Sequence, residues 1–350
     1  MGRRRKGRPI AGWMVIDKPE GITSTKVVSR VRWLLEADKA GHAGTLDPLA
    51  SGILPVALGE ATKTVPFLVD ATKIYRFVAA WGVARSTDDR EGEVTATSAH
   101  RPDEAAIRAI LPRFTGEIEQ VPPAFSAIKV DGERAYDLAR AGAPPELKAR
   151  PVQIHDLELV ELRGPDEAVF EIECGKGTYV RSLVRDMALA LGTVGHVAKI
   201  RRLRVGPFSE SDAIPLSKLE EMGNSAAATS LLKPLQTALD DIPALAMGPQ
   251  EAMRLKRGQT TILRPVYSAQ LSDWARARAG EGSRSASVPS AMEELLGEEA
   301  APPEMEMDGP HVLCLHKGQP VAICRREGHE LKPVRVFNLP WIGDADVGYT

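Results

Sequence analysis

Three stretches of the chain carry apolar residues at helical spacing. The first begins at Ser24, a residue type that caps helix N-termini, and its apolar face consists of Val27, Val28, Val31, Leu34 and Leu35. The second begins at Pro102, where proline followed by acids is typical of a first helical turn. In the third, Thr178 is expected to cap a helix that ends at Gly192, with an apolar stripe of Val180, Leu183, Val184, Met187 and Leu191. The pattern therefore predicts three amphipathic helices.

Elsewhere the apolar residues recur at every second position or form short unbroken runs. Residues 73–83 alternate, which places Tyr75, Phe77, Ala79 and Trp81 on one face of a strand. Further strands are predicted at residues 13–17, 53–58 and 169–174, and a short helix at residues 60–69. Strands and helices are thus mixed along the first two thirds of the chain.

The patterning also indicates how the chain is divided. Residues 120–151 are richer in proline, glycine and charge than their surroundings, as expected of a protruding insertion. A domain boundary is expected near residues 240–248, and a small β domain follows it. In that domain, residues 311–326 predict a hairpin with its turn at residues 317–320. The length of 350 residues also favours about two domains.

The composition is that of an ordinary globular protein and excludes several classes. Hydrophobic residues make up 43% of the chain, and no apolar run approaches the roughly 18 residues of a membrane-spanning helix. Residues 1–10 are basic but lack the apolar stretch of a secretory signal, so we expect a solvated arm that can touch RNA. Three cysteines without paired spacing argue against a disulfide framework or a zinc cage and fit a reducing cytoplasm. They are Cys174, Cys314 and Cys324, and we expect them to be buried as small hydrophobic residues.

The net charge of −2 hides an uneven distribution. Residues 271–308 hold nine acids and three bases, which leaves 42 bases against 38 acids in the rest of the chain. Residues 176–204 hold seven lysines or arginines and one acid, a density able to neutralise phosphates. Such a run is also typical of an ordinary solvated face, so the charge alone leaves both interpretations open.

A glycine-rich loop at residues 41–52, GHAGTLDPLASG, contains a single acid. Pro48 fixes the backbone after Asp47, while Gly44 and Gly52 allow turns and the close approach of an RNA backbone. A carboxylate held in this way can act as a nucleophile or a base. The alternative is that Asp47 is a turn or capping residue, as aspartate before proline commonly is.

Four sequence blocks, in this order along the chain, resemble the TruB family of bacterial tRNA pseudouridine-55 synthases: WMVIDKPEGITS, GHAGTLDPLASG, KIYRFVAAWG and CGKGTYVRSL. The resemblance covers about residues 11–245. The C-terminal hairpin with LKPVRVFNL is similar to the small PUA RNA-binding domain, here residues 246–342. The resemblance implies an α+β (mixed α/β) fold, with a catalytic domain around a central, mostly antiparallel sheet and a small C-terminal β barrel.

The acidic stretch at residues 271–308 departs from a compact PUA domain. Because an acidic loop repels RNA, we expect this insertion to be flexible or to point away from the RNA.

The resemblance also implies an activity. Members isomerise uridine 55 in the T loop of tRNA to pseudouridine, with no cofactor and no metal. The reaction involves no redox change, in agreement with a sequence that has no Walker loop, no GxGxxG fingerprint and no metal-ligand cluster. The expected partner is therefore the T arm of tRNA, without a guide RNA and without a membrane, and the expected protein is a cytoplasmic monomer.

By the same resemblance, Asp47 is the catalytic carboxylate, and Tyr75 and Arg181 complete the catalytic group. Arg181 is expected within about 4 to 6 Å of Asp47, where a bidentate guanidinium keeps the carboxylate charged once RNA excludes water. Arg185, one turn further on, could line the same cleft. Tyr75 is expected to stack on the flipped uracil and to take the C5 proton. The alternatives are a surface arginine at position 181 and simple packing of Tyr75 against Phe77.

The remaining expected roles concern RNA contact. His42 resembles the residue that fills the space left by flipped bases, Lys18 the lysine that supports the Asp47 loop, and Leu203 an apolar residue beneath the uracil. Residues 120–151 resemble a thumb segment that closes over the RNA, with basic residues Lys129, Arg134, Lys148 and Arg150. Phosphate contacts are expected from Lys199, Arg201, Arg202 and Arg204.

Two other functions stay open at this point: a guide-RNA-dependent pseudouridine synthase, and an RNA-folding chaperone whose catalysis is dispensable. The sequence also leaves open whether Asp47 attacks the sugar carbon, adds to uracil C6 or abstracts a sugar proton.

Overall fold

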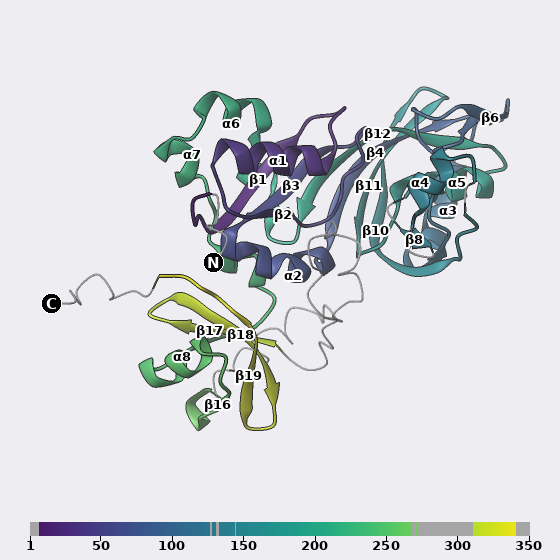
Figure 1. Ribbon diagram of the computed structural model, residues 1–350. Coiled ribbons are helices and arrows are strands. Elements are labelled where there is room, and N and C mark those ends of the chain that lie inside the picture. Colours follow the sequence, from purple (N-terminus) through teal and green to yellow (C-terminus); the bar gives the residue numbers. More distant parts are fainter. Residues whose placement is uncertain are drawn as a thin grey trace.

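The computed structural model describes residues 7–126, 128–130, 133–143, 145–267, 271 and 311–340. Within them, ten strands form a large sheet in the order β14-β1-β3-β12-β4-β11-β10-β7, with β13 beside β12 and β2 beside β3 (Figure 1). Its strands are β1 (Gly12–Lys18), β2 (Ala40–His42), β3 (Ser51–Leu58), β4 (Lys73–Trp81), β7 (Gly116–Gln120), β10 (Arg150–Arg163), β11 (Glu167–Cys174), β12 (Gly195–Val205), β13 (Phe208–Ser209) and β14 (Ile214–Pro215).

Most neighbouring strands of this sheet are antiparallel. In the described residues, the parallel pairs are β1 with β14 and β12 with β3. The predicted α+β fold around a mostly antiparallel sheet is confirmed. Two small hairpins stand apart from it, β5 (Val83–Arg85) with β6 (Val94–Thr97) and β8 (Lys129–Val130) with β9 (Glu133–Arg134).

The helices are short. They are α1 (Ser24–Leu34), α2 (Val65–Asp70), α3 (Glu104–Ile110), α4 (Ala135–Arg140), α5 (Val180–Ala190), α6 (Leu216–Met222), α7 (Ala226–Ser230) and α8 (Pro249–Lys256). Helix α8 lies beside the C-terminal strands rather than the large sheet. Helices α1 and α5 pack on the same face of the large sheet, because their apolar residues share one core with alternate residues of the strands. That core includes Ile16 of β1, Val31 of α1, Phe77 of β4 and Met187 of α5.

The C-terminal strands form a second, curled sheet in the order β15-β17-β18-β19-β16, consistent with a small barrel. They are β15 (Ala244–Ala246), β16 (Thr261–Ile262), β17 (His311–His316), β18 (Gln319–Glu327) and β19 (Glu330–Val336). This sheet packs against the other face of the large sheet, beside α2 (Figure 1). Trp13 and Ile53 share a core there with Ile323 and Phe337. The large sheet is therefore supported on this face by the C-terminal part of the chain.

Two predicted helix starts are wrong in detail. The α1 cap is Thr23, whose side chain accepts a hydrogen bond from Lys26 N, whereas Ser24 is buried. Thr178 does not cap α5, since Tyr179 occupies the N-cap without a side-chain hydrogen bond and Thr178 Oγ1 donates to the carbonyl of Gly175. The helix predicted at residues 60–69 is a 3₁₀ helix, Gly59–Thr64, followed by α2.

Several expectations fall on residues outside the described part of the chain. The acidic insertion at residues 271–308 does so except for Leu271, and the basic arm is described from residue 7 onward. Residues 120–151 are described apart from positions 127, 131, 132 and 144. The predicted division into domains therefore stays a prediction.

Candidate active site

The loop that carries Asp47 joins β2 to β3 and is fixed on both sides of the aspartate. On one side, Ser24 Oγ accepts a hydrogen bond from Leu46 N at 2.8 Å and donates one to Leu46 O at 3.0 Å. On the other side, Leu49 and Ala50 are buried in the same core as α1 and α5. The chain on either side of Asp47 is thus anchored, and its side chain projects from a rigid support.

Lys18 reinforces the same loop from β1. Its ammonium group donates to the carbonyls of Pro19, Ile22 and Pro48, the last at 3.3 Å. The Pro48 carbonyl also accepts from Gly21 N at 2.7 Å. Burial lowers the pKa of Lys18 to about 8, and the nearby charge of Asp47 partly opposes that shift. These contacts agree with the role in loop support expected for Lys18.

The carboxylate of Asp47 faces Arg181 on α5. Oδ2 of Asp47 lies 2.9 Å from Nε of Arg181, and the Asp47 side chain is 39% exposed while that of Arg181 is 5% exposed. The N–H bond of Nε is not aligned for a hydrogen bond, so the contact is an ion pair. In the described residues the Asp47 side chain caps no backbone N–H, although its main-chain carbonyl accepts from Ala50 N. Asp47 therefore begins a turn through its main chain, as the alternative expected, but its side chain does not act as a cap.

The remaining guanidinium nitrogens of Arg181 bind the main chain. Nη1 donates to the carbonyl of Thr87 at 3.0 Å, and Nη2 donates to the carbonyl of Phe125 at 2.9 Å. No hydrogen bond from Arg181 to Asp47 forms among the described residues, so the expected bidentate contact is not present. Arg181 instead joins the Asp47 loop to two other segments.

A second carboxylate near Arg181 was not predicted. Asp89 is 4% exposed, and its Oδ2 lies 3.8 Å from Nη1 of Arg181. Its Oδ1 accepts from the hydroxyl of Thr87 at 2.6 Å and from Glu91 N at 3.0 Å. The sequence STDDREG has the composition of a surface turn, so its acids gave no signal of burial.

Helix α5 also holds the beginning of the 120–151 insertion. Gln120 Oε1 accepts from Tyr179 N at 2.8 Å, and the carbonyl of Val121 accepts from Ser182 Oγ at 2.8 Å and from Arg185 Nη2 at 2.9 Å. Arg185 also pairs with Asp88 at 3.0 Å. The base of the insertion is therefore fixed to the helix that carries Arg181.

Tyr75 lies on β4, on the sheet face that also carries the main core. It is half-buried and packs against that core, in which Phe77 is fully buried. Burial raises the pKa of the Tyr75 phenol, while the positive charge of Arg202 acts in the opposite direction. The charge of Asp47 also raises the pKa of this phenol, by less than burial does. The hydroxyl is therefore protonated at neutral pH.

His42 ends β2, five residues before Asp47. Its Nδ1 is buried without a hydrogen-bond partner in the described residues. Burial, and then the charge of Arg202, lower the pKa of His42 to about 4. His42 is thus a neutral ring beside the loop, which fits the expected space-filling role better than an electrostatic one.

The predicted phosphate-binding group does not form one surface. Arg202 is 1% exposed and donates to the carbonyls of Ile53 and Gly44, so it is not available to RNA phosphates. Arg201 and Arg204 lie on the opposite face of the sheet and pair there with carboxylates. Lys199 is exposed, at a β-bulge of β12. Arg202 lies on the other face from Arg201 because successive strand residues alternate, and the bulge between Arg202 and Arg204 puts Arg204 on the same face as Arg201.

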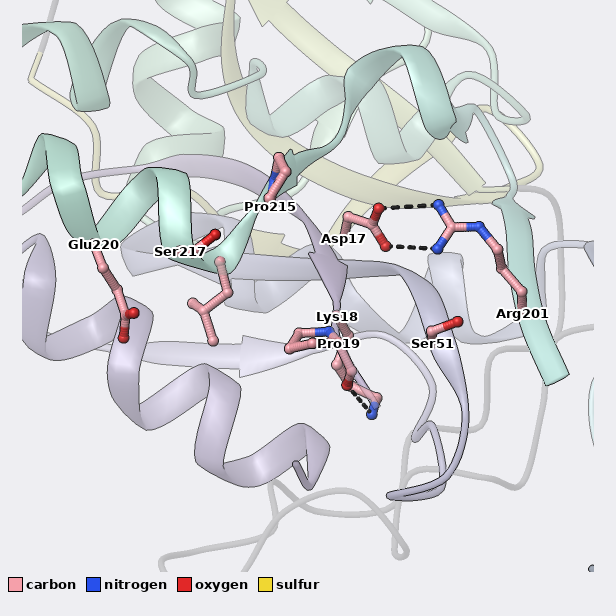
Figure 2. A pocket seen from close by; sticks show the side chains of 9 residues that line it. Asp17, Lys18, Pro19, Ser51, Arg201, Pro215, Ser217 and Glu220 are labelled. Carbon is pink, nitrogen blue, oxygen red and sulfur yellow. Dashed lines mark hydrogen bonds and ion pairs between the residues drawn. The ribbon is translucent and has the colours of Figure 1, made fainter. Parts of the chain in front are cut away.

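Figure 2 shows the pairing of Arg201. Its Nη1 and Nη2 donate to the two carboxylate oxygens of Asp17, at 2.9 and 3.0 Å, across an open pocket of about 370 Å³. These hydrogen bonds raise the pKa of Arg201. Lys18 leaves β1 in the other direction, toward the Asp47 loop. This pocket is lined by neither Asp47 nor Arg181.

The other predicted contact residues are placed as follows. Leu203 is half-buried at the second bulge of β12, between Arg202 and Arg204. Lys129 pairs with Arg134 across the β8–β9 hairpin through the main chain. The side chains of these two basic residues lie outside the described part of the structure. Lys148 and Arg150 are exposed.

Among the described residues, no group of three or more His, Cys, Asp or Glu side chains is arranged to hold a metal ion. No helix among them is long and apolar enough to cross a membrane.

Comparison with known families gives two matches that adjoin each other. Residues 32–180 match the model of the TruB family pseudouridylate synthase N-terminal domain, and residues 181–240 match that of the tRNA pseudouridylate synthase B C-terminal domain. The first match contains Asp47, Tyr75 and Asp89, and the second begins at Arg181.

Comparison with curated proteins gives close relatives. A tRNA pseudouridine synthase B from Caulobacter vibrioides is 50% identical over 97% of this chain and 100% of its own length. Another of the same name, from Bradyrhizobium diazoefficiens, is 59% identical over 75% of this chain and 77% of its own. Among solved structures, an H/ACA RNP bound to a substrate RNA containing 2′-deoxyuridine is 22% identical with a TM-score of 0.64, covering 97% of this chain and 92% of that chain. At this identity the structural match shows a shared fold.

Proposed function

Because the chain belongs to the TruB family of pseudouridylate synthases, we propose that the site around Asp47 converts uridine 55 in the T loop of tRNA to pseudouridine. The protein is an isomerase that acts on tRNA. The proposal includes the position of the uridine and its T-loop context. It also includes action without a guide RNA, as a monomer and in the cytoplasm.

The observation that carries the proposal is the state of the Asp47 carboxylate. It is fixed by its neighbours in the loop, partly exposed, paired with a buried guanidinium and not used for capping. A carboxylate with this support is available to a reactant that arrives from solvent. The neighbouring phenol of Tyr75 provides an aromatic surface on which a base can stack.

The reaction moves one bond within the nucleoside. The N1–C1′ bond breaks with its electron pair leaving on the base, the uracil rotates, and C5 forms a new bond to C1′. The proton lost from C5 is balanced by one gained at N1, so no oxidant is required. A uridine inside an RNA stack must first be extruded to meet Asp47, which agrees with a site that is open to solvent.

Asp47 has three possible modes of action: attack on the sugar carbon, addition to uracil C6, or abstraction of a sugar proton. Each of them needs the negative charge of its carboxylate. Arg181 holds a permanent positive charge beside it in a site from which bound RNA would exclude water. Tyr75, whose hydroxyl is protonated, takes part in proton movement at C5 in this proposal.

Pseudouridine mapping tests the proposal directly. A T-arm hairpin, or a full tRNA transcript, is incubated with purified protein and no other RNA, and pseudouridine is located by mass spectrometry. Wild-type protein should modify uridine 55 of the T loop, and Asp47→Asn should leave it unmodified, a loss of about 1,000-fold or more. Binding should weaken steeply with salt, as contacts to phosphates require. Modification that appears only after a guide RNA is added would contradict the proposal.

A further inference from the structure

Four residues from adjacent strands lie in one row across the large sheet. Lys18 of β1 is paired with Gly52 of β3, Gly52 with Arg202 of β12, and Arg202 with Tyr75 of β4. Side chains directly opposite each other on neighbouring strands are about 4.5 to 5.5 Å apart at Cβ. The row therefore runs from the lysine that supports the Asp47 loop to the tyrosine beside the carboxylate, with Arg202 at its centre.

Arg202 holds both ends of the Asp47 loop. Its Nη2 donates to the carbonyl of Gly44 at 3.1 Å, three residues before Asp47, and its Nε donates to the carbonyl of Ile53 at 2.7 Å, in the strand after the loop. Because the side chain is 1% exposed, these hydrogen bonds are shielded from water. The two contacts fix the span of chain from which Asp47 projects.

Two glycines of the loop, Gly44 and Gly52, pack against the same arginine. A Cβ on Gly52 would lie 2.1 Å from the carbonyl oxygen of Arg202, and one on Gly44 would lie 3.3 Å from Nη1. Both glycines have positive φ, +100° and +83°. Both glycines therefore adopt the turn conformation expected of them, and on the side where a Cβ would stand each meets Arg202.

Burying the positive charge of Arg202 costs free energy, because the charge loses its hydration. No ion pair to Arg202 occurs among the described residues, and its charge lowers the pKa of both Lys18 and His42. An apolar side chain of similar length would avoid the cost of burying a cation. An arginine offers what such a residue lacks, two N–H groups in fixed directions that reach carbonyls on two separate segments.

We propose that Arg202 is a positioning residue for pseudouridine formation, which holds the Asp47 loop at a fixed spacing from Tyr75 so that both meet the same extruded uridine. The inference rests on the proposed function. Arg202 acts through Asp47 and Tyr75 and does not contact RNA phosphates, so its loss should affect the chemical step and leave RNA affinity intact.

The test compares Arg202→Lys and Arg202→Met with wild type in single-turnover reactions at saturating enzyme on T-loop RNA. Displacement of a reacting group by about 1 Å can cost on the order of 100-fold in rate, which is the loss expected for Arg202→Met. Arg202→Lys should lose about tenfold or more, because one ammonium cannot reach both carbonyls. The Kd for RNA should change by less than about twofold in both variants.

Arg76→Met is the matched control. Arg76 precedes Phe77 and follows Tyr75 on β4, but it lies on the opposite face, where it pairs with Glu171 at 2.7 Å. This substitution removes an arginine from the same part of the sheet without touching the Asp47 loop, so its rate should stay within about twofold of wild type.

A double variant tests whether Arg202 acts through the tyrosine. If it does, Arg202→Lys should slow a Tyr75→Phe protein less than it slows wild type, so the two losses should not multiply.

Three outcomes would each overturn the proposal. They are an unchanged single-turnover rate, an RNA affinity that falls in step with the rate, and loss of native circular dichroism in both Arg202 variants. Failure of the proposed function itself would look different, since wild-type protein would then form no pseudouridine.

Discussion

Nε of Arg181 lies 2.9 Å from Oδ2 of Asp47, and the other two nitrogens of the same guanidinium donate to the carbonyls of Thr87 and Phe125. The arginine therefore does more than balance the charge of the aspartate. It sets the distance between the Asp47 loop, the turn that contains Asp89 and the base of the 120–151 insertion. Phe125 belongs to that insertion, so one hydrogen bond connects the insertion to the residue beside the carboxylate.

Replacing Arg181 by lysine should abolish this three-way contact. The charge is kept, but a single ammonium cannot occupy the positions of Nε, Nη1 and Nη2 together. We expect a loss of about 100-fold in kcat on T-loop RNA. Arg185→Lys is a suitable comparison for stability, because Arg185 makes a similar number of contacts one turn further along α5. Wild-type turnover by Arg181→Lys would show that charge alone is enough.

The buried carboxylate of Asp89 should matter for catalysis, since it lies 3.8 Å from Arg181. Asp89→Asn keeps an oxygen to accept from Thr87 and Glu91 but removes the negative charge. We expect kcat to fall about tenfold, equivalent to about 1.4 kcal/mol in the barrier, with little change in the melting temperature. Asp166→Asn, at an exposed pair with Arg101, provides the control. Equal kcat values for the two variants would show that the charge of Asp89 does not contribute to catalysis.

Removing the hydroxyl of Tyr75 should separate stacking from proton movement. Tyr75→Phe keeps the ring, so RNA affinity should change by less than about threefold, while product formation should fall by about 100-fold if the hydroxyl moves a proton. Tyr75→Ala should weaken binding as well, by about 1 to 3 kcal/mol for a lost stacking contact. Gel-shift and single-turnover measurements on the same RNA distinguish the two effects. Full activity in the Phe variant would limit Tyr75 to stacking.

The stability of the protein should depend on Lys18 at alkaline pH. Burial lowers the folded-state pKa of Lys18 to about 8 from an ordinary value of 10.5, so between these two values the unfolded chain binds more protons at this position. The contribution of Lys18 to the free energy of unfolding should therefore rise as pH increases from about 8 to 10.5.

Denaturant unfolding of wild type and Lys18→Met across this range checks the sign. Wild-type stability should increase with pH relative to the variant, which has no group to titrate there. A relative decrease would mean that the three hydrogen bonds of the ammonium raise its folded-state pKa above 10.5.

The chaperone alternative can be tested without catalysis. Asp47 makes no hydrogen bond in the described residues that a neutral amide would break, so Asp47→Asn should keep the fold and the RNA-binding surface. If tRNA folding is a separate activity, this variant should speed the folding of an unmodified transcript as wild type does. Native gel electrophoresis of the transcript measures it, and equal folding with and without protein would argue against a chaperone role.

Much of the site could be predicted because its signals are local. The proline after Asp47, the two glycines around it and the period-two pattern at residues 73–83 fix backbone shape and facing direction within a few residues. The roles expected for Lys18 and Arg181 came from resemblance to a family, and the structure places both at the Asp47 loop.

Other features depend on contacts between distant segments. The bulge between Arg202 and Arg204 decides that Arg204 shares a face with Arg201 and not with Arg202, and nothing in the run of basic residues reveals where strand pairing shifts. Asp89 is buried, 3.8 Å from Arg181, although its local sequence has the composition of an exposed turn.

The sequence by itself determined which residue could carry the negative charge and which strands and helices would hold it, since both follow from short-range backbone preferences and hydrophobic periodicity. Only the tertiary structure decided that Arg181 lies beside Asp47, that Arg201 and Arg204 pair with other carboxylates, and that Arg202 is buried. The physical reason is that burial and charge pairing depend on which segments meet, as Arg202 shows through contacts 149 and 158 residues away in the chain.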